Sequence, residues 1–283
     1  MATILSGKAV ADAISAKVTE DVIMLKEQGV SPCLAIVRVG ENPSDLSYER
    51  GAVKRCELTG VEYKKYELPA DISEEDLLKV IEEVNNDAGI HGVLLFRPLP
   101  KHIDSKKVEN ALLPEKDVDC MTEGSLSGIF TGSNTGYPAC TPQSCIEILD
   151  YYGIDITGKN VVVIGRSLVV GKPVSMMLLA RNATVTICHT KTKNMSDISK
   201  NADIIIAAAG KAGVVTKDYV SAGQTVIDVG INVNDEGKLV GDVAYDEVAE
   251  IVDAITPVPG GVGSVTTSVL ISHVVDAAKK TVK

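Results

Sequence analysis

A glycine-containing segment that follows an apolar run is the first candidate for chemistry in this sequence. The run Val161–Ile164 leads into Gly165-Arg-Ser-Leu-Val-Val-Gly171-Lys-Pro173, and a helical pattern begins at Val174. Glycines let a backbone turn tightly and approach a pyrophosphate, which would lie at the positive end of the helix. The segment lacks the G-x-G-x-x-G spacing that is typical of dinucleotide-binding loops. A plain strand-to-helix turn that binds no ligand is therefore the alternative interpretation. Its place at the first turn of a strand series favours dinucleotide binding. The candidate cofactor residues in this segment are Gly165, Arg166, Ser167, Val170 and Gly171.

The end of the next predicted strand indicates which dinucleotide is bound. Domains that bind NAD usually place an acidic residue there for the ribose hydroxyls. Here Ala183–Ile187 is followed by Cys188-His-Thr-Lys-Thr-Lys193, which contains no acid. Arg166, Thr190 and Lys191 instead supply cationic and hydroxyl donors suited to a 2′-phosphate. The sequence therefore favours NADP over NAD, with NAD as the alternative.

The six cysteines and four histidines show no metal-binding pattern. No two cysteines form a Cys-x-x-Cys pair, and no two histidines have metal-ligand spacing. We interpret them as reduced thiols and ordinary histidines rather than as disulfides or metal ligands, so no metal is expected.

Apolar periodicity predicts the elements that must position these residues. The first half alternates predicted helices at 7–28, 47–58 and 73–86 with predicted strands at 34–39, 63–68 and 92–96. This alternation predicts a parallel sheet covered by helices on both faces. Weaker periodicity and repeated glycines predict loops and the domain junction over 104–141.

The second half repeats the alternation more regularly. Helical patterns cover 141–152 and 266–280, and short strands are predicted at 160–164, 183–187, 203–207, 225–229 and 252–255. Such a series predicts a doubly wound nucleotide-binding sheet. The expected fold class is α/β, with an N-terminal α/β domain over 1–140 and a C-terminal Rossmann-type domain over 141–283. The last helix, 266–283, is able to pack back on the first domain.

Composition narrows the classes of function. The 283 residues include 28 basic and 38 acidic side chains, giving a formal net charge of −10, and 45% are hydrophobic. The hydrophobic content excludes disorder as the main state, and the acidic balance disfavours a nucleic-acid partner. No apolar run reaches membrane-spanning length, and the N-terminus lacks a signal-peptide pattern. We therefore expect a cytoplasmic protein without a membrane partner.

Six phrases follow one another along nearly the whole chain. They are Val39-Gly-Glu-Asn-Pro43 with Tyr48, Lys116-Asp-Val-Asp119, Gly165-Arg-Ser-x-x-Val-Gly-x-Pro173, Ala183-Thr-Val-Thr-x-Cys-His189, Val226-Ile-Asp-Val-Gly-Ile-Asn232 and Thr256-Pro-Val-Pro-Gly-Gly-Val-Gly263. In this order they resemble the methylenetetrahydrofolate dehydrogenase/cyclohydrolase family. The resemblance implies oxidation of 5,10-methylenetetrahydrofolate by NAD(P)⁺ and hydrolysis of the methenyl product to 10-formyltetrahydrofolate. It also implies a folate domain, a Rossmann domain, a cleft between them and a homodimer.

The resemblance assigns roles to matching residues. Tyr48 matches a tyrosine that stacks on the folate rings, and Asp119 matches an acid that holds the pterin, so both are candidates for catalysis and substrate binding. The remaining substrate-binding candidates, beside folate and nicotinamide, are Pro259, Gly260, Gly261 and Gly263. The further cofactor candidates are His189, Thr190, Lys191, Asp228, Gly230 and Ile231. Taken one at a time, these residues also have ordinary structural interpretations, as a tyrosine in the core, an acidic residue on the surface or part of a turn.

Two positions depart from the family where hydrolysis takes place. Family members with both activities carry a lysine four residues after the tyrosine, and here that position is Ala52. Lys54 lies two residues further, but two helical residues rotate a side chain by about 200°, so it should point away. A family glutamine that tunes the lysine is replaced by Phe96. Since hydrolysis needs an acid/base near neutral pH and hydride transfer mainly needs alignment, we expect a dehydrogenase with lost or weak cyclohydrolase activity.

Other interpretations remain open. The enzyme keeps both activities if Lys54 or Arg97 compensates, although the pKa of arginine is too high for a general base. A catalytically silent folate or nucleotide binder is a second alternative. Asp45 stands where serine is common and is a candidate to stabilise the methenyl cation, or else a loop or helix-cap residue. Cys120 stands where glycine is usual.

Overall fold

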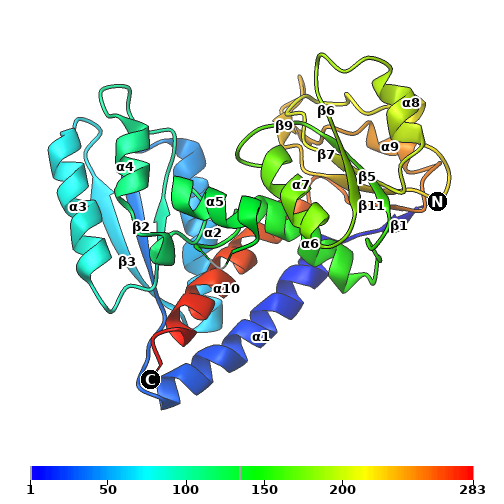
Figure 1. Cartoon of the computed structure of the whole chain (residues 1–283). Coiled ribbons are helices and arrows are strands. Elements are labelled where there is room, and N and C mark those ends of the chain that lie inside the picture. The colour runs from blue at the N-terminus through cyan, green and yellow to red at the C-terminus, as the bar shows by residue number, and fades with distance from the viewer. Residues whose placement is uncertain (1, 134, 283) are drawn as a thin grey trace. The chain divides into compact units, whose positions relative to one another are not determined.

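The computed structural model describes residues 2–133 and 135–282 and divides into two compact units (Figure 1). Unit 1 comprises Met1–Ala11 and Thr141–Thr266, and unit 2 comprises Asp12–Cys140 and Thr267–Lys283. The expected N-terminal domain covers 1–140, whereas residues 2–11 group here with the second half of the chain. The reason is β1 (Thr3–Ile4), which pairs in parallel with β11 (Ala254–Ile255).

Unit 2 is built on a three-stranded parallel sheet in the order β3-β2-β4. Its strands are β2 (Cys33–Val39), β3 (Glu62–Leu68) and β4 (Gly92–Leu95), and its main helices are α1 (Gly7–Glu27), α2 (Pro43–Thr59), α3 (Glu74–Asn86) and α10 (Thr266–Lys279). Leu77, Ile81 and Val84 of α3 are fully buried in a core shared with β2 and β4. In Figure 1 the sheet lies between α3 and α2.

Helix α2 begins earlier than the predicted start at residue 47 because its cap was overlooked. The Asn42 side chain accepts a hydrogen bond from the Ser44 amide at 2.9 Å, and Pro43 is the first helical residue. Both residue types favour those positions in a helix start. The helix ends at Gly60, whose φ of 75° is in the left-handed region. Asp45 and Tyr48 therefore lie in its first two turns.

The loops predicted for residues 104–141 are wrong, because two helices form there. They are α4 (Ser105–Ala111) and α5 (Glu123–Thr131), with a 3₁₀ helix at Pro114–Lys116 between them. Asp104 caps the first and Thr122 caps the second through side-chain oxygens that accept backbone N–H groups. Gly128 serves close packing, because an added Cβ would lie 2.1 Å from the Thr135 carbonyl oxygen. Gly128, which the sequence analysis took as a loop signal, therefore lies in a helix contact, whereas Gly132 has a φ of 68° and ends α5.

Unit 1 confirms the doubly wound sheet that the strand series predicts. The six parallel strands run in the order β1-β11-β8-β7-β5-β6. Besides β1 and β11 they are β5 (Asn160–Ile164), β6 (Thr184–Cys188), β7 (Ile204–Ala207) and β8 (Thr225–Asp228). The order of strands reverses between β5 and β7, and ligands of such sheets bind at the carboxyl ends near that reversal.

The remaining elements of unit 1 surround this sheet. The helices are α6 (Cys140–Tyr151), α7 (Gly171–Ala180), α8 (Met195–Lys200) and α9 (Tyr245–Val248), with 3₁₀ helices at Lys217–Tyr219 and Val262–Ser264. An antiparallel hairpin, β9 (Asn232–Val233) with β10 (Leu239–Val240), follows β8 and was not predicted. Two-residue strands carry too little periodicity to be recognised from sequence.

Within residues 2–133 and 135–282 every helix is too short or too polar to span a membrane.

The six cysteines are buried and free. Burial raises the pKa of Cys56 and of Cys120 to about 12, so both thiols stay protonated near neutral pH and are poor nucleophiles.

Replacing either of two helical glycines by alanine should change the free energy of unfolding, but in opposite directions. A Cβ at Gly51, inside α2, would meet only the Thr267 methyl at 3.6 Å, an ordinary contact. We expect Gly51→Ala to raise the free energy of unfolding by about 0.5–1 kcal/mol, since alanine loses less backbone entropy. Gly128→Ala, the matched change in α5, should lower it by about 1–3 kcal/mol because of the clash with Thr135. Urea unfolding followed by circular dichroism tests both, and a destabilised Gly51→Ala would contradict the expectation.

Candidate active site

The loop between β5 and α7 requires glycine at both ends. Gly165 has a φ of 138°, and its amide donates to the Cys188 carbonyl at 2.9 Å. A Cβ at Gly165 would lie 2.1 Å from the Ala208 carbonyl oxygen, and one at Gly171 would lie 2.3 Å from the Gly165 carbonyl oxygen. The loop is therefore pressed against the ends of two neighbouring strands, where a side chain at either position would not fit.

The first amides of α7 are already paired within the chain. The Ser167 hydroxyl accepts from the amides of Val170 at 3.0 Å and Gly171 at 3.5 Å. The Lys172 amide donates to the Ser167 carbonyl and the Val174 amide to the Val170 carbonyl, each at 3.0 Å. A pyrophosphate at these helix amides, as the sequence predicts, would share them with Ser167 or displace it.

The predicted nucleotide-specificity residues share one edge of the sheet. Strands β5 and β6 pair in parallel with Ile164 opposite Cys188, so the residues that follow them leave the same edge. The His189 amide donates to the Thr192 hydroxyl at 2.9 Å, and the Lys191 amide donates to His189 Nδ1 at 3.1 Å. In this turn the side chains of Thr190 and Lys191 are exposed. The side chain of Arg166, which follows the neighbouring strand β5, is also exposed.

A pocket of about 240 Å³ lies at the carboxyl ends of β8 and β11. Its lining includes candidates that the sequence analysis divided between cofactor and substrate. They are Asp228, Gly230, Ile231, Pro259, Gly260, Gly261 and Gly263. Gly7, which sequence reasoning missed, supports this lining: its amide donates to the Gly260 carbonyl at 2.8 Å, and a Cβ on it would lie 2.0 Å from the Gly261 carbonyl oxygen. A glycine at the first position of α1 was the available signal.

The Asp228 carboxylate is hydrogen-bonded to the backbone around this pocket. It accepts hydrogen bonds from the amides of Gly230 at 2.9 Å, Asp242 at 2.9 Å and Val243 at 3.0 Å. Burial raises its pKa to about 6, although the three amide donors oppose the rise. Asp228 therefore shapes the loop after β8 through hydrogen bonds, while its backbone contributes to the pocket wall.

Asp242 is a second buried carboxylate that sequence reasoning missed. It accepts from the amides of Gly210 at 2.8 Å and Lys211 at 2.9 Å, and from the Asn232 side chain at 3.0 Å. It thus joins the loop after β7 to the β9–β10 hairpin. An acid beside glycine, in Gly241-Asp242, was the only signal, because its partners lie 10 to 32 residues away.

In unit 2, Tyr48 lies on α2 and packs edge-on against Phe96, with ring centroids 6.1 Å apart and planes at 83°. Ala52, one helical turn after Tyr48, is 0% exposed. Lys54 is exposed, in agreement with the expectation that its side chain leaves the other side of the helix. The described contacts therefore place an aromatic ring and a methyl group where the family carries a glutamine and a lysine.

Next to Tyr48, Glu49 takes part in a buried ion-pair network. Arg38 Nε donates to Glu49 Oε2 at 2.8 Å, and Lys65 Nζ lies 2.7 Å from Glu49 Oε1. Arg38 also donates to Glu67 at 3.0 Å and to the Gly40 carbonyl. Burial raises the pKa of Glu49, but hydrogen bonds from Lys65 and Arg38 outweigh it, and the pKa lies below its usual value. The network thus stabilises the fold above about pH 4.5, and this contribution is lost as the pH falls through the lowered pKa.

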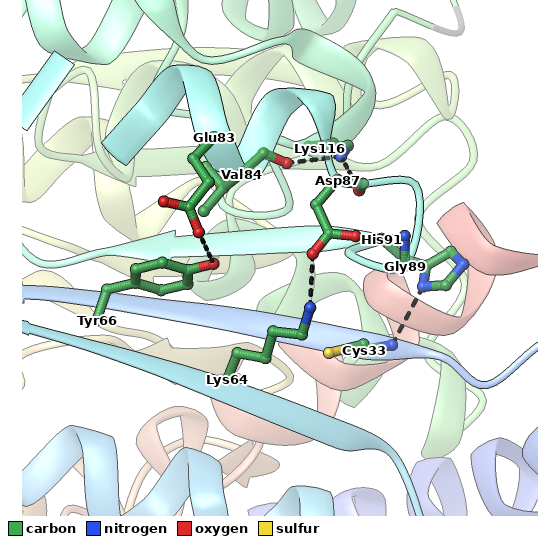
Figure 2. Close-up of polar contacts among 9 residues, drawn as sticks. All are labelled: Cys33, Lys64, Tyr66, Glu83, Val84, Asp87, Gly89, His91 and Lys116. Atoms are coloured by element: carbon green, nitrogen blue, oxygen red, sulfur yellow. Dashed lines mark hydrogen bonds and ion pairs between the residues drawn. The ribbon is translucent and has the colours of Figure 1, made fainter. Parts of the chain in front are cut away.

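The loop that carries Asp119 is anchored by its neighbours (Figure 2). Lys116 Nζ donates to the carbonyls of Val84 at 2.7 Å and Asp87 at 2.6 Å, where α3 ends. Asp117 is fully buried and accepts from the amides of Met121 and Thr122. The first two residues of the Lys116-Asp-Val-Asp119 phrase are therefore structural.

Asp119 itself is half-buried, and its Oδ1 accepts from the Cys140 amide at 3.0 Å, the first amide of α6. The next residue, Cys120, has a φ of 54°, which explains why glycine is usual at this position. The direction of the carboxylate is thus set by a backbone amide that lies 21 residues further along the chain. Tyr48 and Asp119 both belong to unit 2, and all the cofactor candidates belong to unit 1.

Removing one partner of the Arg38–Glu49 pair should destabilise unit 2. Glu49→Leu leaves the buried guanidinium short of a partner, and we expect a loss of about 3–5 kcal/mol in the free energy of unfolding. Arg38→Met combined with Glu49→Leu removes both charges and should recover most of the loss. Urea unfolding of the two variants measures the difference. A double variant as unstable as Glu49→Leu would show that packing, and not an unpaired charge, causes the effect.

Both halves of the chain match known protein families. Residues 5–119 match the family model described as tetrahydrofolate dehydrogenase/cyclohydrolase, catalytic domain, and residues 139–282 match the NAD(P)-binding domain of the same description. The bifunctional protein FolD of Carboxydothermus hydrogenoformans is 52% identical over 281 residues, covering 99% of this chain and 98% of that protein.

Solved structures that resemble this chain include proteins of the same description. The bifunctional enzyme FolD, a methylenetetrahydrofolate dehydrogenase/cyclohydrolase from Campylobacter jejuni, superposes with a TM-score of 0.96 at 39% identity and covers 99% of both chains. The Trypanosoma brucei methylenetetrahydrofolate dehydrogenase-cyclohydrolase, complexed with NADP cofactor and inhibitor, superposes with a TM-score of 0.92 at 34% identity and covers 100% of this chain and 99% of that one. With its motifs, its two-unit fold and both domain matches in agreement, the chain belongs to the tetrahydrofolate dehydrogenase/cyclohydrolase family.

Proposed function

We propose that this chain oxidises 5,10-methylenetetrahydrofolate to the methenyl form with NADP⁺ as the preferred acceptor, as a cytoplasmic homodimer, and that its methenyl cyclohydrolase activity is lost or severely weakened. The observation that carries the proposal is the surroundings of Tyr48, where Ala52 and Phe96 supply only apolar atoms. The relatives named bifunctional support the dehydrogenase part.

The residues of unit 1 fit a dinucleotide. The loop glycines keep side chains away from the strand ends, and the pocket of about 240 Å³ beside β8 and β11 offers room for a ring system. When bound, the nicotinamide supplies the acceptor for a hydride. Arg166, Thr190 and Lys191 would bind a 2′-phosphate through charge and hydroxyl donors. The Pro259–Gly263 segment, held by Gly7, would form the wall against the ring.

Two residues of unit 2 would hold the folate. Tyr48 would stack on the rings, and its edge contact with Phe96 limits its rotation. Asp119 would accept N–H groups of the pterin, since the Cys140 amide already fixes the direction of one carboxylate oxygen. Alignment of this kind is the main contribution that a protein makes to hydride transfer.

Hydrolysis of the methenyl group needs a side chain that takes and returns a proton near neutral pH. Alanine and phenylalanine have no titratable group. Lys54 is exposed, and Arg97 is directed to Glu109, with 3.9 Å between nitrogen and oxygen. Neither residue is placed at the Tyr48 face by any described contact, which weighs against a compensating lysine or arginine.

Asp45 would favour the oxidised product. Hydride removal leaves a positive charge on the methenyl carbon and its nitrogens, and a nearby carboxylate stabilises such a charge as it develops. Asp45 lies one helical turn before Tyr48, and burial raises its pKa while Arg38 lowers it. The absence of a lysine at Ala52 also removes a like charge from the vicinity of the cation.

Restoring the family pair should restore hydrolysis. We expect the wild type to form the methenyl product and to convert it to 10-formyltetrahydrofolate only at the uncatalysed rate. Ala52→Lys with Phe96→Gln should hydrolyse at least about tenfold faster, since general acid–base groups contribute factors of about 10²–10⁴ when well placed. Reduced cofactor, methenyl and 10-formyl products are followed separately by chromatography of quenched samples.

Lys54→Ala is the matched control, because it removes a lysine of the same helix that faces away. Rapid 10-formyl formation by the wild type that disappears in Lys54→Ala or Arg97→Ala would establish the bifunctional alternative instead. A protein whose melting temperature rises with NADP⁺ but that reduces none of it when folate is added would be the silent binder.

The nucleotide preference has its own test. Lys191→Ala should raise KM for NADP⁺ by about tenfold and leave KM for NAD⁺ within about twofold, since a charge-assisted hydrogen bond contributes about 1.5–3 kcal/mol. Lys193→Ala, two residues further along the same turn, is the control and should change neither. A higher kcat/KM with NAD⁺ than with NADP⁺ in the wild type would show the preference to be wrong.

A further inference from the structure

His273, on α10, contacts the residue immediately before Asp119. It is 7% exposed, and its Nδ1 lies 2.9 Å from the Val118 carbonyl oxygen. Since a carbonyl oxygen only accepts, Nδ1 must carry the hydrogen and donate it. The C-terminal helix therefore holds the peptide group that leads into the pterin-binding candidate.

The imidazole is fixed by an aromatic and cationic stack. The Tyr137 ring lies 5.4 Å from the His273 ring with planes at 32°, and the Lys280 ammonium lies 4.3 Å from the Tyr137 ring centroid. Both contacts fall in the range of favourable ring and cation–π interactions. Lys280 is seven residues after His273 on the same terminal segment, so the stack keeps Nδ1 pointed at its acceptor.

Close packing fixes the distance between α10 and this loop. A Cβ on Gly92, at the start of β4, would lie 2.6 Å from a Val118 methyl and 2.9 Å from a Val274 methyl. The residue next to His273 and the acceptor residue are thus pressed against the same glycine. A small shift of α10 would move Val118.

Cys140 completes the support from the other side. Its thiol donates to the same Val118 carbonyl at 3.4 Å, and its amide donates to Asp119 Oδ1 at 3.0 Å. Burial and the neighbouring Asp119 keep the pKa of this thiol well above its usual value, so it remains a donor. The backbone before Asp119 and the carboxylate of Asp119 are held by one connected set of hydrogen bonds.

We propose that His273 is a positioning residue for folate binding, acting through the Val118 carbonyl to set the direction of the Asp119 carboxylate. The inference rests on the proposed function in that Asp119 binds the pterin. Its contribution is to ground-state binding of folate, because it acts on the orientation of a binding group and not on the cofactor.

Three substitutions separate the hydrogen bond from mere packing. His273→Asn keeps an N–H at the position of Nδ1, whereas His273→Gln moves it outward and His273→Leu removes it. We expect His273→Leu and His273→Gln to raise KM for 5,10-methylenetetrahydrofolate by about three- to tenfold, the equivalent of one hydrogen bond. KM for NADP⁺ and kcat should stay within about twofold, and His273→Asn should resemble the wild type. Assays run well below the melting temperature of each variant.

Equal KM values for folate in the wild type and His273→Leu would overturn the inference, as would a rise in His273→Asn as large as that in His273→Leu. A wild type without turnover would instead contradict the proposed function. In that case, calorimetric titration with tetrahydrofolate tests His273 independently. Weaker binding by His273→Leu, restored in His273→Asn, would support the positioning role, and unchanged binding would refute it.

Discussion

Close approach of backbone to backbone at the carboxyl ends of the parallel strands is the constraint on which the nucleotide-binding unit depends. Gly165 lies against the Ala208 carbonyl, and the Ala208 amide in turn donates to Ile164 at 2.8 Å. Gly171 then returns the chain to Gly165. With these contacts only glycine fits at positions 165 and 171, so the loop after β5 lies close to the ends of β6 and β7. The candidates in this loop and in the turn after β6 follow from that approach, whereas Asp228, Gly230 and Ile231 lie at the end of β8.

Buried carboxylates hold the remaining loops in both units. Asp228 and Asp242 organise the turns after β8 and β7, and Asp117 holds the turn after Asp119, each through backbone N–H donors. A buried carboxylate is costly unless it is paired, but several amide donors offset that cost. Such hydrogen bonds are directional, so they order irregular backbone that apolar packing alone would leave loosely defined. Glu49 follows the same principle with two side-chain cations as its partners.

The surroundings of Tyr48 show how chemistry and scaffold separate in this family. Ala52 is buried, and Phe96 packs edge-on against Tyr48, so both positions are occupied by apolar side chains. The same helix carries Glu49, whose ion pairs with two strands hold α2 on the sheet. The position of α2 is thus maintained by contacts that do not involve the side chain at position 52. Under the proposed function, such a site would retain the alignment that hydride transfer needs and would lack the proton transfer that hydrolysis needs.

Features that depend on local physics could be predicted from the amino-acid sequence alone. Apolar periodicity located the three strands of the smaller sheet and five of the larger one, but not the two-residue β1, and the order of the short phrases indicated the family and the two departures at Ala52 and Phe96. The sequence analysis did not predict where three helices begin. Caps at Asn42, Asp104 and Thr122 begin α2, α4 and α5, although apolar periodicity is weak there.

The pairing of distant polar residues could be read from the folded chain but not from the sequence. The partners of Asp242 are up to 32 residues away, and His273 meets Val118 across 155 residues. Nor does the sequence show that the α7 amides are already paired, because that depends on the conformation of the loop. Periodicity reports which side of an element is buried, whereas hydrogen-bond partners depend on how distant segments meet, and that is set by the packing of the whole unit.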